Sequence, residues 1–484
     1  MSVAAAVARN TIIQTIGKIV SIALGWFIVL TMTNYLGAEG FGAYTIMTTY
    51  LQFFAVAVDL GFVLVSSQLL AESQNVERTF ANLFTFRLCT SLIILALAPF
   101  IIWFLPYTTV VKEGVVVLTI SFFLVALLQV FVGLFQKELA IGRAIAGELM
   151  GRVVLLLVVL MATVQHRSIL FMVVGVVVGS VANFSLAAIL ARRFVRLRLA
   201  YDAEVWRLIW QRSWPLALGI VFNLIYLKAD TLILSLTRTQ AEVGVYGAMY
   251  RVLEVLVTFP TMFVGLLLPL MSVAWARGNR QEFQNILQAA LDTVLYVAWP
   301  MVVGVTFTAS RLTTMFGSDF SQAGWVLWLL VVATAVIFIG TFFGHVVVAV
   351  GKQRSMIGAY ALTAVFGLTG YLVFIPTYGA YGAAAMTLVA ELFVATLAYV
   401  VVRRVVGISP SFAKLGVALT ASLPMALYLW LGASLPLLVL IGGAVLMYVA
   451  ALYLMGALPR ELLRAMFATT LSPSEPPVPL RVMD

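Results

Sequence analysis

Residues 169–198 read ILFMVVGVVVGSVANFSLAAILARRFVRLR, and this stretch decides how the rest of the chain is interpreted. Residues 169–191 carry no charged side chain, and an apolar run of this length crosses the roughly 30 Å hydrocarbon core of a bilayer as one α-helix. Four arginines follow directly, at 192–198. Because lysine and arginine mark the cytoplasmic end of a span, the stretch predicts a transmembrane helix that leaves the membrane on the cytoplasmic side.

Similar apolar runs fill the whole chain. Hydrophobic residues make up 63% of the sequence and charged residues only 10%, whereas a soluble domain carries about 25% charged residues. We therefore predict an all-α integral membrane protein with about fourteen transmembrane helices, since the runs do not alternate as barrel strands would. The predicted spans are 11–34, 42–69, 80–105, 114–136, 145–164, 169–191, 214–236, 243–272, 284–309, 322–349, 356–376, 381–402, 412–432 and 435–456.

The cations also predict the topology. With the N-terminus in the cytoplasm, only Lys112, Arg167, Arg238 and Arg311 fall in outside loops, and most of the remaining lysines and arginines fall inside. This asymmetry predicts a multi-pass protein of the plasma (inner) membrane with both termini cytoplasmic. It also explains the net charge of +10 as topology, so we expect no nucleic-acid partner.

The longest cytoplasmic link divides the spans into six, six and two. We define an N-lobe (1–191), an amphipathic linker (192–213), a C-lobe (214–402), a final pair of spans (403–456) and a partly disordered cytoplasmic tail (457–484). Trp206 and Trp210 share one face of the linker, which predicts an interfacial helix on the inner leaflet. Phe41-Gly42-Ala43-Tyr44 and Val243-Gly244-Val245-Tyr246 each open the second span of a lobe, which predicts parallel pseudo-repeats about an axis along the membrane normal.

Charged residues inside the predicted spans are the candidates for function. Each costs roughly 2.5–3.5 kcal/mol at the membrane centre, so each should face protein or water. The cations Lys18, Arg87, Lys228 and Arg251 could together bind a pyrophosphate, and the carboxylates Asp59, Asp230, Glu254 and Glu391 are candidates for coupling to H⁺ or Na⁺. The alternative for each of these residues is a structural ion pair, and Arg251 with Glu254 is the clearest such pair. For Glu148 and Arg152, a structural ion pair is the favoured interpretation.

No catalytic constellation accompanies these charges. The histidines are His166 and His345, the single cysteine is Cys89, and no glycine loop ending in Gly-Lys-Ser/Thr is present. No group of His, Cys and carboxylates has metal-ligand spacing. We therefore expect neither enzyme activity nor a cofactor nor a bound metal.

Several segments resemble the polysaccharide-transport branch, the Wzx-like oligosaccharide flippases, of the multidrug/oligosaccharidyl-lipid/polysaccharide (MOP) superfamily. The glycine-rich segment Leu36–Tyr44 is the most specific of them. The others are Arg9-Asn10-Thr11, Asp59-Leu60-Gly61, Lys228-Ala229-Asp230, Val243–Tyr246 with Pro260, and Tyr378-Gly379 with Gly382-Ala383-Ala384. The resemblance implies two six-helix lobes around a central cavity that opens to each side of the membrane in turn.

These observations lead to one functional hypothesis and two alternatives. The hypothesis is a flippase for a polyprenyl-diphosphate-linked oligosaccharide, with lipid-linked oligosaccharide and membrane lipids as partners, H⁺ or Na⁺ as possible coupling ions, and polysaccharide-assembly proteins as possible associates. A cation-coupled multidrug antiporter would instead use acidic residues to control the cavity. A non-transporting envelope-assembly scaffold would have no connected cavity.

Overall fold

A computed structural model describes residues 3–407 and 409–457, with side chains described from residue 13 onward except at 215–227. The N-terminal motif Arg9-Asn10-Thr11 therefore lies outside the described side chains, and all but the first residue of the predicted tail lies outside the described chain. Every element in the described part is helical, which confirms the predicted fold class. The elements are α1 (Val3–Asp59), α2 (Phe62–Glu72), α3 (Val76–Ile101), η1 (Ile102–Phe104), α4 (Thr109–Lys137), α5 (Ile141–Val164), α6 (Ile169–Ala191), α7 (Ala203–Thr237), α8 (Gln240–Ala276), α9 (Arg280–Thr314), η2 (Ser318–Phe320), α10 (Gly324–Ala349), η3 (Gln353–Met356), α11 (Ile357–Val406), α12 (Lys414–Leu431) and α13 (Leu437–Leu454).

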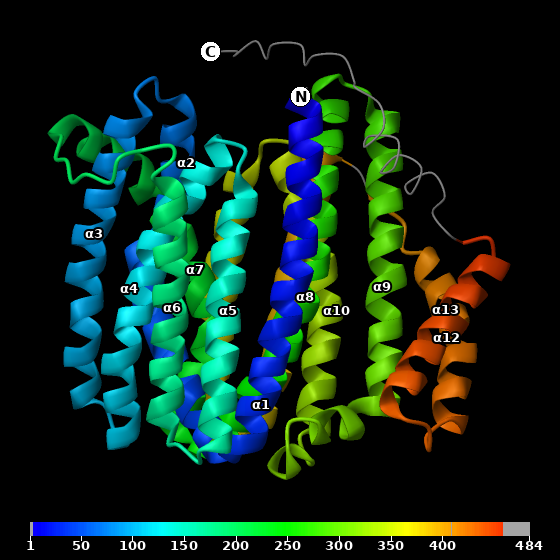
Figure 1. The fold of residues 1–484 in the computed structure, drawn as a ribbon. Helices are drawn as coiled ribbons and strands as arrows, with labels where there is room; N and C mark the ends of the chain where they lie inside the picture. Colours follow the sequence, from blue (N-terminus) through cyan, green and yellow to red (C-terminus); the bar gives the residue numbers. More distant parts are fainter. Residues whose placement is uncertain (1–2, 408, 458–484) are drawn as a thin grey trace.

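Eleven of the described helices are long and apolar enough to cross a membrane. Two of them, α1 and α11, are interrupted by Gly37 (φ 67°) and Gly379 (φ 57°), where only glycine adopts the backbone conformation without strain. In Figure 1, α1 runs from the N-terminus to the opposite end of the molecule, and the chain then returns to α2. Helix α11 therefore holds two predicted spans. Helix α1 holds the first predicted span and most of the second (42–69), which continues into α2 after a break at residues 60 and 61, while the total of fourteen stays a prediction.

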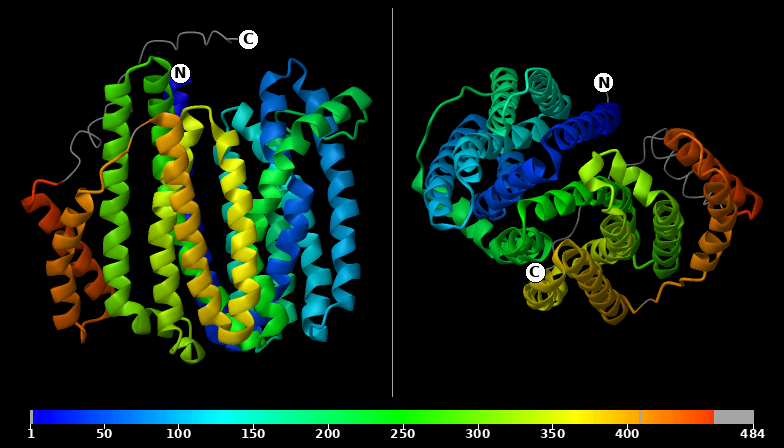
Figure 2. Two further views of the ribbon diagram at one scale, coloured as in Figure 1. Left: turned by 180° about the vertical axis from the view of Figure 1, so that it is seen from behind. Right: turned by 90° about the horizontal axis from the view of Figure 1, so that it is seen from below.

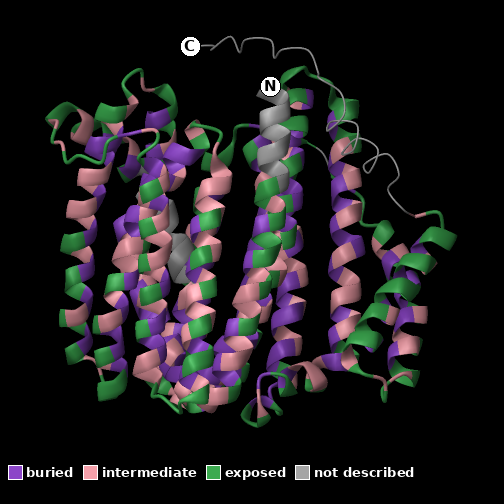
Figure 3. Ribbon diagram, in the orientation of Figure 1, coloured by how far each residue is buried: buried purple, intermediate pink, exposed green. Residues whose placement is uncertain are grey.

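The outer surface of the helix bundle is apolar, as lipid contact requires. On α13, for example, Leu438, Leu446 and Leu454 are 83%, 72% and 84% exposed (Figure 3). A water-soluble protein would bury such side chains, because exposed apolar area costs about 25 cal/mol per Å² in water. In lipid the same side chains carry no such cost.

The buried core is joined at one end of the molecule and divided at the other. We call the end of the molecule where α1 begins the terminal end, and the opposite end, where the chain reverses direction within α1 and within α11, the distal end (Figures 1 and 2). One hydrophobic cluster contains residues of both lobes, including Phe41 and Met47 of α1 and Tyr246 of α8. Two further clusters each belong mainly to one lobe, around α2–α4 in one case and around α8–α11 in the other. Helices α12 and α13 pack as a pair on α9.

The two glycines of the sequence repeat meet at the distal contact between the lobes. A Cβ added to Gly42 would lie 1.7 Å from the carbonyl oxygen of Gln240, and one added to Gly244 would lie 1.9 Å from that of Ala38. Each glycine thus packs on the carbonyl four residues before the other glycine. Such a reciprocal contact is what a two-fold relation produces, so it confirms the parallel pseudo-repeat.

The linker differs in one respect from its prediction. Instead of a separate interfacial helix, its second half forms the start of α7, which continues without interruption to Thr237. Trp206 packs edge-to-face on Phe86 of α3 and on Tyr201, whereas Trp210 is 59% exposed. One linker tryptophan therefore anchors the segment to the N-lobe, because its ring fits between two protein aromatics rather than facing the membrane surface.

Candidate substrate-binding site

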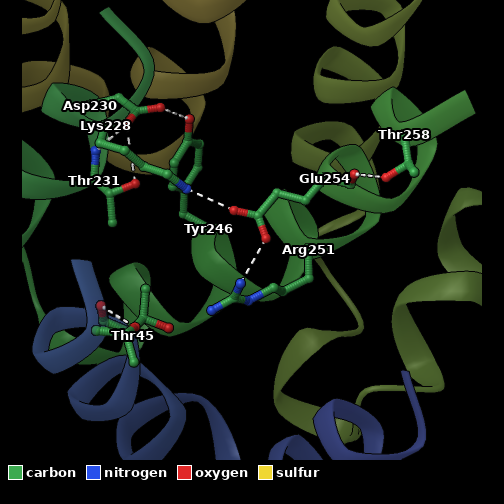
Figure 4. Close-up of polar contacts among 9 residues, drawn as sticks. Thr45, Lys228, Asp230, Thr231, Tyr246, Arg251, Glu254 and Thr258 are labelled. Carbon is green, nitrogen blue, oxygen red and sulfur yellow. Dashed lines mark hydrogen bonds and ion pairs between the residues drawn. The ribbon is translucent and has the colours of Figure 1, made fainter. Parts of the chain in front are cut away.

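Three charged side chains of the C-lobe form one ionic cluster. The Nζ of Lys228 on α7 and an Nη of Arg251 on α8 each lie 2.7 Å from a different carboxylate oxygen of Glu254 (Figure 4). Lys228 Nζ also lies 4.4 Å from the centre of the Tyr250 ring. Because Glu254 is shared by two cations, the cluster has a net charge of +1, which we call the C-lobe cluster.

Asp230 lies next to this cluster but has its own hydrogen bonds. Its carboxylate accepts hydrogen bonds from the Tyr246 hydroxyl and from the backbone N–H and hydroxyl of Thr231 (Figure 4). The Tyr246 hydroxyl is in turn 3.3 Å from the hydroxyl of Thr387 on α11. Lys228 therefore bonds to Glu254 rather than to its sequence neighbour Asp230, because two residues apart on a helix side chains point in different directions.

The N-lobe carries a second ionic cluster of the same composition. Glu148 on α5 lies 3.8 Å from Lys18 Nζ on α1 and 3.3 Å from an Nη of Arg152, and it accepts a hydrogen bond from Ser21. Again one glutamate is shared by two cations, leaving a net charge of +1 in what we call the N-lobe cluster. Lys18 and Arg152 remain 45% and 35% exposed, so both can reach a ligand.

Tyr44 connects the two clusters in space. It lies on the second segment of α1 and is close enough to interact electrostatically with Arg251 of the C-lobe cluster and Arg152 of the N-lobe cluster. The guanidinium of Arg152 also packs against α1, since a Cβ at Gly25 would lie 2.4 Å from its Nη1. Each of the two positively charged clusters therefore places an arginine within electrostatic range of Tyr44.

Arg87 is not part of either cluster. It is 3% exposed, and its guanidinium donates to the carbonyls of Val58 and Ala126 and to the carboxylate of Asp59, 3.2 Å away. The helical chain is interrupted directly after Asp59, at residues 60 and 61, which both have positive φ. Arg87 thus satisfies a carbonyl left free at a helix end, and the structure separates Arg87 and Asp59 from the other predicted site residues.

The remaining predicted residues fall in different surroundings. Glu391 is 5% exposed on α11, within electrostatic range of Tyr250 and Tyr371. His345 bonds through Nδ1 to the carbonyl of Thr341 one turn earlier on α10. Within the described residues no three His, Cys, Asp or Glu side chains are grouped as metal ligands would be.

Arg152 is the residue that the sequence interpretation undervalued. Its i,i+4 pairing with Glu148 is present as predicted, but the same glutamate also binds Lys18 from another helix. The available signal was that Lys18 and Ser21 lie three residues apart and so share one face of α1, but the sequence could not show that this face lies against α5.

Comparison with known proteins identifies the family. The family model described as "Polysaccharide biosynthesis protein" matches residues 31–324. The chain belongs to this family of polysaccharide biosynthesis proteins. The match covers most of both lobes, including the segment Leu36–Tyr44 that carries the resemblance in the sequence. No curated protein matches the chain closely enough to add a more specific assignment.

Solved structures show which fold this family member has. The structure described as "Lipid II flippase MurJ, inward closed conformation" superposes with a TM-score of 0.78 at 15% identity, covering 93% of this chain and 99% of that one. An inward-facing multidrug resistance MATE family transporter of the MOP superfamily gives 0.69 at 13% identity, covering 80% of this chain and 94% of that one. An outward-facing transporter of the same description gives 0.59 at 14% identity, covering 83% and 95%. The polysaccharide biosynthesis protein therefore has the fold of the MOP transporters.

Proposed function

We propose that this polysaccharide biosynthesis protein is a flippase that moves a polyprenyl-diphosphate-linked oligosaccharide, a precursor of cell-surface polysaccharide, from the inner to the outer leaflet of the plasma membrane. The observation that supports this most directly is the pair of matching clusters, one in each lobe, in which two cations share one glutamate. Each cluster retains an excess positive charge at membrane depth, where an unneutralised cation is costly. A ligand with two adjacent phosphates would neutralise both clusters at once.

The side chains suit a diphosphate for chemical reasons. Arg152 and Arg251 can each bind phosphate oxygens through two parallel N–H donors, while Lys18 and Lys228 act as point charges. All four are at least partly exposed, at 35%, 31%, 45% and 18% respectively. The apolar polyprenyl chain would stay in the lipid, so only the polar head group has to pass between the lobes.

Alternating access is the motion that we propose for transport. The lobes share a core at the distal end and have separate cores elsewhere, which suits a molecule closed at the distal end. With the termini in the cytoplasm, this state would admit substrate from the inner leaflet. Binding of the diphosphate between the clusters would draw the lobes together at the terminal end and favour opening of the distal contact.

Coupling to an ion is a separate part of the proposal. Among the four candidate carboxylates, Asp59 and Glu254 each form an ion pair with an arginine, and Glu391 is buried on α11. Asp230 is 1% exposed, and its carboxylate accepts hydrogen bonds from neutral groups of Thr231 and Tyr246, which makes it the best candidate to take up a proton during the cycle. Substitution Asp230→Asn should abolish the dependence of transport on a proton gradient.

The test is translocation of a fluorescent polyprenyl-diphosphate oligosaccharide in proteoliposomes. We expect Arg152→Gln and Arg251→Gln each to lower the initial rate at least tenfold, and Arg403→Gln, an exposed cation at the end of α11, to leave it unchanged. Normal rates in both cluster variants would exclude the diphosphate mechanism. Efflux of a cationic dye without glycolipid transport would instead support the multidrug antiporter, and absence of any transport would favour the scaffold.

A further inference from the structure

The first part of the linker forms a basic segment that is fixed against the N-lobe. We call residues 192–202, between α6 and α7, the basic strap. Its arginines at 192, 193, 196 and 198 are all exposed. In the described part of the chain, none of these four takes part in an ion pair or hydrogen bond of its side chain. The strap therefore presents four unneutralised guanidinium groups.

Several contacts hold the strap in one position. Val195 is 4% exposed in the N-lobe core, and the Phe194 ring lies 4.3 Å below the guanidinium of Arg143 and against Phe135. Ala200 donates its backbone N–H to the hydroxyl of Thr85 on α3. A solvated charge run would not be anchored in this way, since its backbone would gain nothing from packing.

One ion pair holds the last residue of the strap, and a second holds the first part of α7, which follows it. Asp202 at its last residue binds Arg78 at the start of α3, and Arg212 on α7 binds Glu72 at the end of α2 at 2.8 Å. The strap therefore lies beside the ends of α2 and α6 and the start of α3, and we expect lipid head groups where such apolar helices end. Leu199 and Tyr201 beside the arginines are 66% and 72% exposed, so apolar side chains accompany the charge.

We propose that the basic strap is a binding site for anionic phospholipid head groups of the leaflet at the terminal end. Guanidinium groups bind phosphate oxygens in pairs, and neighbouring apolar side chains enter the acyl boundary, which is the combination that surface-bound basic segments use. Because the strap is pre-ordered by its anchors, it loses little conformational freedom when a lipid binds. Since the strap contacts α3, α4 and α5 and leads directly into α7, lipid binding would also stabilise the junction between the lobes.

The experiment compares two variants with equal loss of charge. Purified protein in neutral detergent is titrated with phosphatidylglycerol or phosphatidylcholine, and bound lipids are counted by native mass spectrometry. R192Q/R193Q/R196Q/R198Q removes the strap cations, while R277Q/R280Q/R403Q/R404Q removes four exposed cations at the ends of α8, α9 and α11. Circular dichroism and the melting temperature show that both variants are folded.

We expect the wild-type protein to retain phosphatidylglycerol in preference to phosphatidylcholine. The strap variant should need about tenfold more phosphatidylglycerol for the same occupancy, and the control variant less than twofold more. Equal losses in the two variants, or equal retention of both lipids by the wild type, would overturn the proposal. Co-purification of RNA that depends on the strap arginines would do so as well, in favour of a nucleic-acid surface. No glycolipid is present, so the result is independent of the flippase assay.

Discussion

A single methyl group at the contact between the lobes should open the distal end of this protein. In Gly244→Ala the new Cβ would lie 1.9 Å from the carbonyl oxygen of Ala38, whereas real Cβ atoms essentially never come closer than 3.0 Å. Helices α1 and α8 must therefore separate by about 1.1 Å to remove the overlap and about 1.5 Å to reach ordinary contact at 3.4 Å. The neighbour is backbone, so no change of rotamer can relieve the overlap.

The energetic consequence can be estimated from similar substitutions. Overpacking by one methyl group typically costs 1–3 kcal/mol, and a rigid backbone neighbour places this case near the upper limit. A difference of about 1–3 kcal/mol between two conformations changes their ratio by about 5- to 150-fold. Because only the distal-closed state contains the contact, the substitution should shift the population strongly toward the distal-open state.

Double electron–electron resonance measures this shift directly. In a Cys89→Ser background, spin labels at Thr109 of α4 and Trp325 of α10 report the separation of the lobes at the distal end, and both positions are exposed. We expect the distance distribution of Gly244→Ala to move to longer distances. Gly265→Ala is the matched control, because it lies on the same helix and a Cβ there would meet nothing within 4 Å. If both variants give the wild-type distribution, the reasoning about the backbone contact is refuted.

Three further predictions concern the ionic contacts. Glu254→Gln should lower the melting temperature more than Arg251→Gln. The first variant leaves the cations Lys228 and Arg251 facing each other, whereas the second leaves Lys228 neutralised by Glu254. Equal effects would contradict the shared role of Glu254. Arg87→Lys should destabilise the protein by roughly 1–3 kcal/mol in denaturant unfolding, since one ammonium group cannot reach the three acceptors that the guanidinium binds, and wild-type stability would argue against its capping role. The hydrogen bond from the Arg78 guanidinium holds the pKa of Asp202 below its ordinary value of 3.8. The contribution of this ion pair to stability is therefore present above that pH and is lost as the pH falls through the lowered pKa. A spin label at Leu199 should therefore keep constant mobility between pH 5 and 8 and become mobile only below about pH 4, whereas Asp202→Asn should make it mobile at neutral pH.

The sequence by itself determined the class of protein and much of its plan. Apolar runs long enough for a bilayer can only be helices, because lipid offers no partner for backbone N–H and C=O groups. The repeated glycine motifs at Gly42 and Gly244 also predicted the two-fold relation, since a short motif at equivalent positions of two lobes reflects a shared packing requirement. Within the clusters, the pairs Arg251–Glu254 and Arg152–Glu148 could be predicted because i,i+3 and i,i+4 neighbours on one helix must be close.

Only the tertiary structure decided which helices face one another. Lys18 and Glu148 are 130 residues apart in the chain, as are many pairs that never meet, and the sequence of a helix face does not identify the helix that packs against it. For the same reason the sequence grouped Arg87 with the other cations, although packing of α1, α3 and α4 gives it three acceptors of its own. The sequence shows which side chains are charged, but long-range packing decides which partner neutralises each of them. That is why the charged residues inside the spans could be named from the sequence, whereas their division into two clusters could not.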